Sequence, residues 1–216
     1  MLRKITFALI VLFFSGSVLV VHGQQAITYN LVKLLRENML ETYSNQQTTV
    51  LDSTKQAIST NGIDWLKGVN FKDGTIDVDL RGKDVFLKSF LGIAFHARDT
   101  TTYEVIFFRP FRFHSTDLPT RKWSVQYMSM PEFDYAKLRK EHPGVYENEI
   151  NLVPGAEDWF HATIVIKRDS ITVYVNHSVT ASLKIKKLSN LNDGKIGLWS
   201  SPGALSGDFA NLRISE

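Results

Sequence analysis

The chain of 216 residues contains no cysteine, so no disulfide can hold it together and its hydrophobic core must provide the stability. Its charge is also nearly balanced. The formal charge of +3 includes Arg3 and Lys4, which leaves +1 for residues 24–216. Nucleic-acid binding requires a basic stripe, so this balance gives no reason to expect a nucleic-acid partner.

The sequence also lacks the short motifs of common catalytic and metal sites. It contains no nucleophile elbow, phosphate loop or dinucleotide fingerprint. None of its six histidines has the i, i+4 spacing of a zinc pair on a helix, and there is no acid-rich calcium loop. We therefore predict no metal and no cofactor; calcium stays open, without a motif in its favour.

Residues 1–23 are typical of a secretory signal peptide. Arg3 and Lys4 form a basic start, an apolar run covers 5–21, and Val21-His-Gly23 suits cleavage. The alternative is an uncleaved anchor, since the run approaches the ~20 residues that span a bilayer. We favour cleavage, with no stable membrane insertion afterwards, because Ser15-Gly-Ser17 weakens the run. The predicted location is secreted or periplasmic, and the absence of cysteine favours a bacterial host.

The remaining 193 residues suit one large β-sandwich domain. Residues 24–47 are predicted to be an N-terminal segment, in which 30–43 carry apolar side chains at helical spacing. From Thr48 onward, apolar residues instead recur at every second position, which predicts a domain of β-strands over 48–216. The expected strands are 49–52, 56–58, 74–81, 91–95, 103–109, 123–127, 160–167, 171–175, 182–186, 195–199 and 209–214.

These strands recur at short intervals without a long helix between them. This spacing predicts an all-β fold of two antiparallel sheets packed face to face, preceded by a short helical segment. The polar stretch 131–148 is the exception. We expect it to be a long insertion with a helix near 135–139.

Several short blocks resemble one known superfamily through their order along the chain. They are Phe71-x-x-Gly-Thr-Ile-Asp-Val-Asp79, Gly92-Ile-Ala-Phe95, Phe108-Arg-Pro110, Val125-Gln-Tyr127, Trp159-Phe-His161, Val173-Tyr-Val-Asn176, Gly194-Lys-Ile-Gly-Leu-Trp199 and Asp208-Phe-Ala-Asn-Leu212. Together they resemble the concanavalin A-like lectin/glucanase superfamily, and within it the 3-keto-disaccharide hydrolase-type domains and their laminin G-like relatives. The resemblance covers roughly 48–216. It implies a jelly-roll sandwich whose concave face or rim loops contact glycans.

The basic and aromatic stretch Arg109-Pro-Phe-Arg-Phe-His-Ser115 is the first candidate for ligand binding. The guanidinium groups of Arg109 and Arg112 are planar donors that can orient sugar hydroxyls or a carboxylate. Alternation places Arg109 at the end of an otherwise apolar strand face. The alternative is structural: Arg109 pairs with Glu104 or Asp117 while the phenylalanines fill the core.

A second group of candidates combines an amide with aromatic rings. Gln126 can donate to and accept from a hydroxyl pair. It faces opposite to Tyr127, so only one of these two side chains points into a cleft. Trp199 and Tyr146 are predicted stacking platforms for a sugar ring, whereas Trp123 and Trp159 are expected in the core. Cross-strand contacts and core packing are the structural alternatives for all of them.

Asp77 and Asp79 are the candidate catalytic residues. They lie two apart on one strand face, so their Cα atoms are ~7 Å apart, and glycoside hydrolysis uses paired carboxylates at similar separations. Two aspartates on a solvent-exposed face fit the same pattern without chemistry. The acids at 132 and 134 do not reproduce the glucanase signature, because Pro131 precedes them and no third acid follows.

The predicted function is an exported protein that binds a carbohydrate or glycan through a cleft and the basic loop. The first alternative is a glycoside hydrolase of the 3-keto-disaccharide hydrolase type, for which the acid–base groups available are Asp77, Asp79, Glu104 and His114. The second alternative is an interaction protein of the cell envelope without a sugar ligand. Whether any reaction is catalysed stays open.

Overall fold

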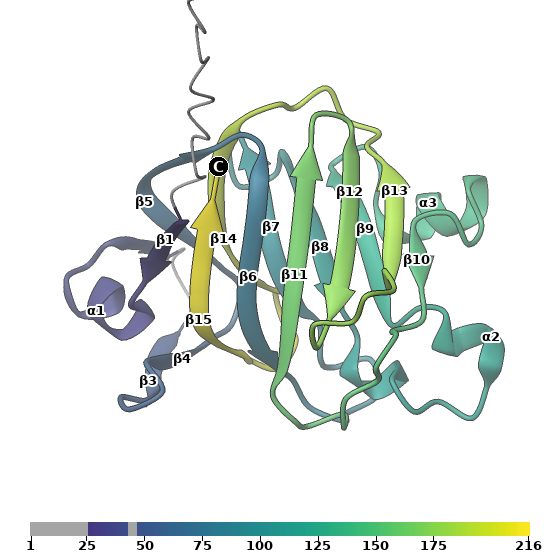
Figure 1. The fold of residues 1–216 in the computed structure, drawn as a ribbon, viewed down its shortest axis with the longest axis horizontal. Helices are drawn as coiled ribbons and strands as arrows, with labels where there is room; N and C mark the ends of the chain where they lie inside the picture. Colours follow the sequence, from purple (N-terminus) through teal and green to yellow (C-terminus); the bar gives the residue numbers. More distant parts are fainter. Residues whose placement is uncertain (1–25, 43–46) are drawn as a thin grey trace, which may run out of the picture.

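The computed structural model describes residues 26–42 and 47–216, which form two antiparallel sheets stacked face to face (Figure 1). Sheet A has the order β13-β12-β11-β6-β15-β4-β3, with β1 beside β15. Its strands are β1 (Ala26–Tyr29), β3 (Thr48–Asp52), β4 (Ala57–Thr60), β6 (Gly74–Arg81), β11 (Phe160–Lys167), β12 (Ser170–Val175), β13 (Leu183–Lys186) and β15 (Gly207–Ser215). The predicted antiparallel sandwich is confirmed.

Sheet B has the order β10-β9-β8-β7-β14-β5-β2. Its strands are β2 (Leu40–Thr42), β5 (Ile63–Phe71), β7 (Leu91–Ala97), β8 (Tyr103–Phe108), β9 (Val125–Met130), β10 (Glu147–Asn148) and β14 (Gly194–Ser200). The helices are short and lie at the two lateral edges in Figure 1: α1 (Leu31–Arg36) at one, α2 (Leu118–Arg121) and α3 (Tyr135–Glu141) at the other. A 3-10 turn, η1 (Pro110–Arg112), follows β8.

The hydrophobic core lies between the sheets, and strand alternation determines which side chains enter it. In β6, Ile76, Val78 and Leu80 are fully buried, whereas the residues between them are half-buried on the outer face. The register of β11 places Ile164 opposite Ile76, so the two strands present one continuous apolar surface. Burying such side chains stabilises the fold by about 1.5–3 kcal/mol each.

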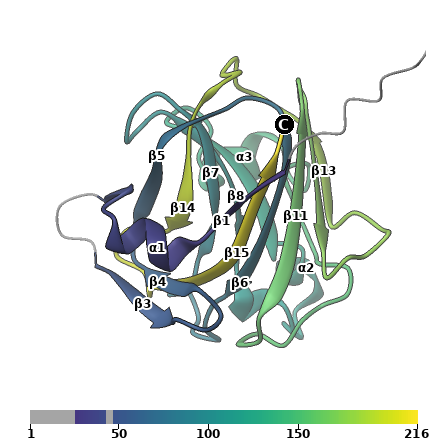
Figure 2. The same ribbon diagram turned by 60° about the vertical axis from the view of Figure 1, so that its left-hand side comes forward.

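Strands β7 and β8 are buried on both faces. Their inner face packs on sheet A, as the contact between Phe108 and Phe160 shows, with ring centroids 5.1 Å apart. The side chains of their outer face are buried as well, and α3 contacts the neighbouring strand β9. Figure 2 shows the two layers and the connections around them.

The N-terminal helix ends earlier than the apolar spacing predicted. Helix α1 spans only six residues and stops where Asn38 adopts the left-handed conformation (φ 54°). The N–H of Met39 donates to Leu34 O and that of Asn38 to Leu35 O, which is a Schellman ending. The chain then forms β2 against β5, while β1 extends sheet A, so residues 26–42 contribute a strand to each sheet.

The sequence analysis did not predict one long strand, β5. Strand β5 lacks clear alternation because Lys67 and Gly68 are exposed in succession, and Gly68 has a φ of 77°. The insertion at 131–148 fits its prediction, since Asp134 caps α3 by accepting from the N–H of Lys137 at 2.8 Å.

No helix within 26–42 or 47–216 is long and apolar enough to cross a membrane. The predicted signal peptide, residues 1–23, lies outside the described residues.

Candidate functional site

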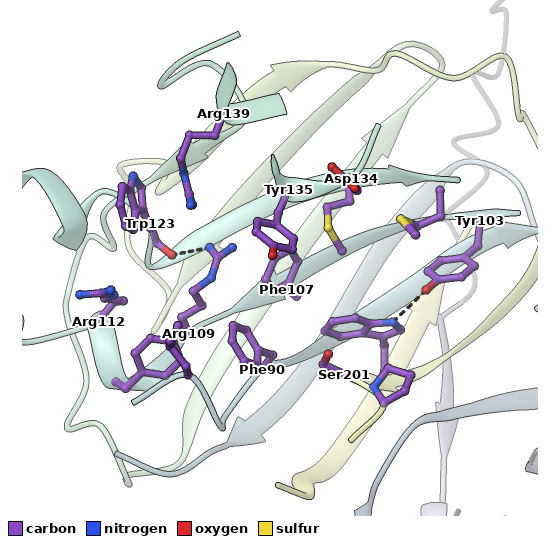
Figure 3. Close-up of a pocket in the computed structure, with 16 residues that line it drawn as sticks. Phe90, Tyr103, Phe107, Arg109, Arg112, Trp123, Asp134, Tyr135, Arg139 and Ser201 are labelled. Atoms are coloured by element: carbon purple, nitrogen blue, oxygen red, sulfur yellow. Dashed lines mark hydrogen bonds between the residues drawn. The ribbon is translucent and has the colours of Figure 1, made fainter. Parts of the chain in front are cut away.

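A pocket of about 550 Å³ opens on the outer face of sheet B (Figure 3). Its position follows from the alternation of β8, in which Phe108 faces sheet A while Phe107 faces away from it. The lining is dominated by aromatic and basic side chains: Phe90, Tyr103, Phe107, Phe111, Trp123, Tyr135, Trp199, Arg109, Arg112 and Arg139. Pockets of this size and character are the usual sites for small ligands.

The floor of the pocket is a row of side chains that the strand register brings together. Phe107 and Trp199 are both paired with Gly92, which lies between them in the sheet. A side chain at Gly92 could not be accommodated, because its Cβ would lie 2.0 Å from Ile106 O. The two rings are therefore neighbours, with centroids 5.3 Å apart, and Trp199 Nε1 donates to the hydroxyl of Tyr103 at 3.3 Å.

Arg109 ends this floor on one side, as its place on the strand face predicted. Its guanidinium lies 4.6 Å from the ring centroid of Phe107 and donates to Trp123 O at 2.7 Å and to Gln126 Oε1. The side chain is only 5% exposed. Burial, followed by repulsion from Arg139, lowers the pKa of Arg109 to about 9, so it remains a cation at neutral pH.

Two further arginines flank Arg109 in Figure 3. Arg112 donates to Thr120 Oγ1 at 3.0 Å and lies between the rings of Phe86 and Trp123, 4.8 and 5.4 Å from their centroids. Arg139, on α3, stacks on Trp123 at 3.8 Å. It also donates to both carboxylate oxygens of Glu147, at 3.1 and 2.7 Å. Neither Arg109 nor Arg112 donates to a carboxylate within the described residues.

The rim adds exposed aromatic surface. Phe86 is 61% exposed and packs edge-on against Phe111, with ring centroids 5.7 Å apart. Tyr135 is 52% exposed at the start of α3, and its ring faces the pocket in Figure 3. Among the residues lining the pocket, Asp134 is the single carboxylate. The pocket therefore offers apolar ring faces and guanidinium donors, with few acidic groups.

The six predicted ligand-binding residues divide according to their strand face. Arg109, Arg112 and Trp199 line the pocket, and Gln126 lies beneath it as an acceptor for Arg109. Tyr127 is the next residue in β9 and must therefore face the core.

The core-facing Tyr127 donates its hydroxyl to Glu104. Tyr146 is 7% exposed and packs on Tyr127, with centroids 5.7 Å apart, rather than on the pocket. The two acids considered as partners for Arg109, Glu104 and Asp117, do not pair with it. Glu104 faces the core beside His96 and Lys187, and Asp117 precedes α2 on the surface.

Sequence reasoning missed two contributors to the pocket, Trp123 and Arg139. Trp123 was expected in the core, but it is half-buried and forms a wall between Arg112 and Arg139. Trp159 was also expected in the core, but it is half-buried outside the pocket, with Lys55 and Arg81 over its ring. No sequence pattern indicated that Arg139 would line the pocket, because its position depends on how α3 packs against sheet B.

Asp77 and Asp79 lie on the outer face of sheet A, outside the pocket, and His161 bridges them. His161 Nδ1 is 2.9 Å from Asp79 Oδ1, and Nε2 is 3.3 Å from Asp77 Oδ1. Thr163 also donates to Asp77 at 2.7 Å, and Asn211 to Asp79 at 2.7 Å. These hydrogen bonds and the charges raise the pKa of His161 to about 9. The cluster is thus an ion-paired network.

No group of three or more histidine, aspartate or glutamate side chains that could hold a metal occurs in the described parts of the chain.

No protein-family model and no curated protein matches the chain. Solved structures do match it. The carbohydrate-binding module CBM66 from Bacillus subtilis is similar with a TM-score of 0.51 and 14% identity, over 79% of this chain and 95% of that one.

Two more structures match at the same TM-score of 0.51. A Bacillus subtilis protein of unknown function with a galectin-like fold is 10% identical, over 82% of this chain and 93% of that one. A native glycosidic hydrolase is 13% identical, over 90% and 96%. At such identities the matches show the fold alone. They confirm the jelly-roll sandwich, whereas the concanavalin A-like superfamily and its 3-keto-disaccharide hydrolase subtype stay predictions.

Proposed function

We propose that this protein binds a carbohydrate in the pocket on the outer face of sheet B. The observation that carries the proposal is the floor formed by Phe107 and Trp199, which ends at the buried guanidinium of Arg109. Sugar rings have apolar C–H faces and polar edges. Aromatic rings pack against the faces, and planar donors at the end of the floor reach the oxygens.

Two of the similar structures support this ligand class, because one is named a carbohydrate-binding module and another a glycosidic hydrolase. We further propose that the protein acts outside the cytoplasm, after removal of the predicted signal peptide at 1–23. Binding is preferred over hydrolysis because the common glycosidase mechanism uses two carboxylates, whereas Asp134 is the single one lining this pocket.

The test combines a glycan array with isothermal titration of the glycans that bind. Tyr135→Ala and Arg112→Ala change exposed or half-exposed side chains at the rim, so both variants should fold while losing affinity by about tenfold or more. Tyr174→Ala, a half-buried tyrosine of sheet A outside the pocket, is the matched control and should bind normally. Absence of binding to any glycan, or binding unchanged in both rim variants, would overturn the proposal.

A parallel screen with 3-keto and ordinary disaccharides tests the hydrolase alternative. Turnover that disappears in Asp77→Asn or Asp79→Asn, but persists in Arg112→Ala, would move the function to the outer face of sheet A. Without such turnover, sugar binding in the pocket stands as the proposal.

A further inference from the structure

We infer that the carbohydrate carries a carboxylate, as a uronic acid unit does, and that Arg109 and Arg112 bind this group. The inference rests on the proposed function and specifies the ligand class of the same pocket. It follows from the balance of charges and hydrogen-bond donors at one end of the pocket.

The cations at this end outnumber the acids. Arg139 is already neutralised, since both of its donating nitrogens face the carboxylate of Glu147. Arg109 and Arg112 have neutral acceptors instead, namely a carbonyl, an amide and a hydroxyl oxygen. Together with Asp134, the single acid that lines the pocket as a whole, these five ionised groups sum to +1. One monovalent anion would balance them.

The arginine end of the pocket also contains hydrogen-bond donors that have no acceptor. Arg112 Nε and Gln126 Nε2 are buried without a hydrogen-bond acceptor in the described residues. Buried donors are almost always paired in folded proteins, and an unpaired one is unfavourable. Acceptor oxygens are therefore what this site lacks, and a carboxylate brings two of them without adding a donor.

Because Arg109 is buried, the absence of a carboxylate bonded to its guanidinium is unfavourable for the free energy of folding. The guanidinium is nearly enclosed, and its lowered pKa reflects the loss of solvation. An unpaired charge at such a position is unfavourable, and an opposite charge offsets this. A carboxylate from the ligand would provide it, and the planar guanidinium matches the two carboxylate oxygens in geometry.

The layout of the pocket matches a ring with an acidic substituent. Figure 3 places the arginines at one end and Tyr103 at the other, with Phe107 and Phe90 between them. Trp199 donates to the Tyr103 hydroxyl and so lies beside it. In a uronic acid the carboxylate projects from the edge of the sugar ring. The ring face can therefore pack on Phe107 while the carboxylate lies between Arg109 and Arg112.

Galacturonate and glucuronate disaccharides, compared with their methyl esters, provide the sharpest test, because the ester keeps the shape and removes the charge. Calorimetry should show the acid binding at least about tenfold more tightly than the ester, the effect of one charge-assisted hydrogen bond. Arg112→Gln should remove most of this preference. Arg121→Gln, whose arginine pairs with Glu149 on the surface and does not line the pocket, is the control and should keep it.

Arg109→Lys provides a second variant, in which the charge remains and the planar fork is lost. It should weaken binding of the acid more than binding of the ester. Equal affinity for acid and ester, a stronger preference for sulfated disaccharides, or a preference unchanged in Arg112→Gln would each overturn the inference. If only neutral glycans bind, the inference fails while the proposed function stands; if no glycan binds, both fail.

Discussion

Replacing His161 should destabilise the protein near neutral pH and have much less effect at alkaline pH. The β6–β11 register places His161 directly opposite Asp79, with Asp77 two residues along the same face. Both imidazole nitrogens therefore face carboxylate oxygens, an arrangement that favours the protonated ring. Hydrogen bonding from His161 lowers the pKa of Asp77 in turn. At Asp79 burial opposes the change, but hydrogen bonds from His161 and Asn211 outweigh it.

The size and sign of the effect follow from linkage between protonation and folding. A histidine whose pKa is raised on folding stabilises the protein fully below its unfolded pKa, near 6.5, and loses this contribution as the pH rises through about 9. The rise corresponds to about 3 kcal/mol without screening. Because the His161 side chain is 20% exposed and its partners similarly so, solvent screening reduces this to about 1–2 kcal/mol.

Urea unfolding of wild type and His161→Gln at pH 6 and pH 10 measures this contribution. The variant should be less stable by about 1–2 kcal/mol at pH 6 and nearly equal to wild type at pH 10. His114→Gln, which changes an exposed histidine, is the matched control. NMR titration of the imidazole gives the pKa directly. A His161 pKa near 6.5, or the same loss of stability at both pH values, would refute the reasoning.

Two further variants test the interior. Ile164→Ala removes a fully buried side chain of β11 and should lower the free energy of unfolding by about 2–5 kcal/mol in urea unfolding; a loss below about 1 kcal/mol would mean that the core collapses around the cavity. Glu104→Ala leaves the hydroxyl of Tyr127 and the ammonium of Lys187 without their carboxylate and should cost about 3–5 kcal/mol. Glu104→Gln, which keeps a hydrogen-bond acceptor, should cost less, and equal losses would contradict the electrostatic explanation.

Alternation predicted the fold well wherever one face of a strand is solvated. In β6, polar and apolar residues alternate because one face meets the core and the other meets water. β8 was recognised from its apolar residues, but the burial of both its faces was not evident. β5 was not predicted, because Gly68 interrupts the alternation of its side chains. The helix near the N-terminus was predicted too long, because Asn38 ends it in a left-handed conformation.

The site was predictable only in part, because alternation assigns faces without saying what covers them. It placed Arg109 on the same face as Tyr103 and Phe107, and it required Gln126 and Tyr127 to point in opposite directions. Which of the last two belonged to the pocket depended on the packing of β9 against β8. The contribution of Arg139 could not be read at all, since it depends on tertiary packing of α3.

The two clusters proposed from the sequence lie on opposite outer faces of the sandwich, which makes their tests independent. Arg109 lies on sheet B and Asp77 on sheet A, and the core between the sheets is filled by side chains such as Phe108 and Phe160. Packed sheets are ~10 Å apart, so a ligand in the pocket contacts neither aspartate. Because of this separation, a change at Asp77 should leave sugar affinity unaltered, and a change at Arg112 should leave the titration of His161 unaltered. If either change altered the other property, the faces would be coupled through the core, and assigning the ligand to the pocket alone would be wrong.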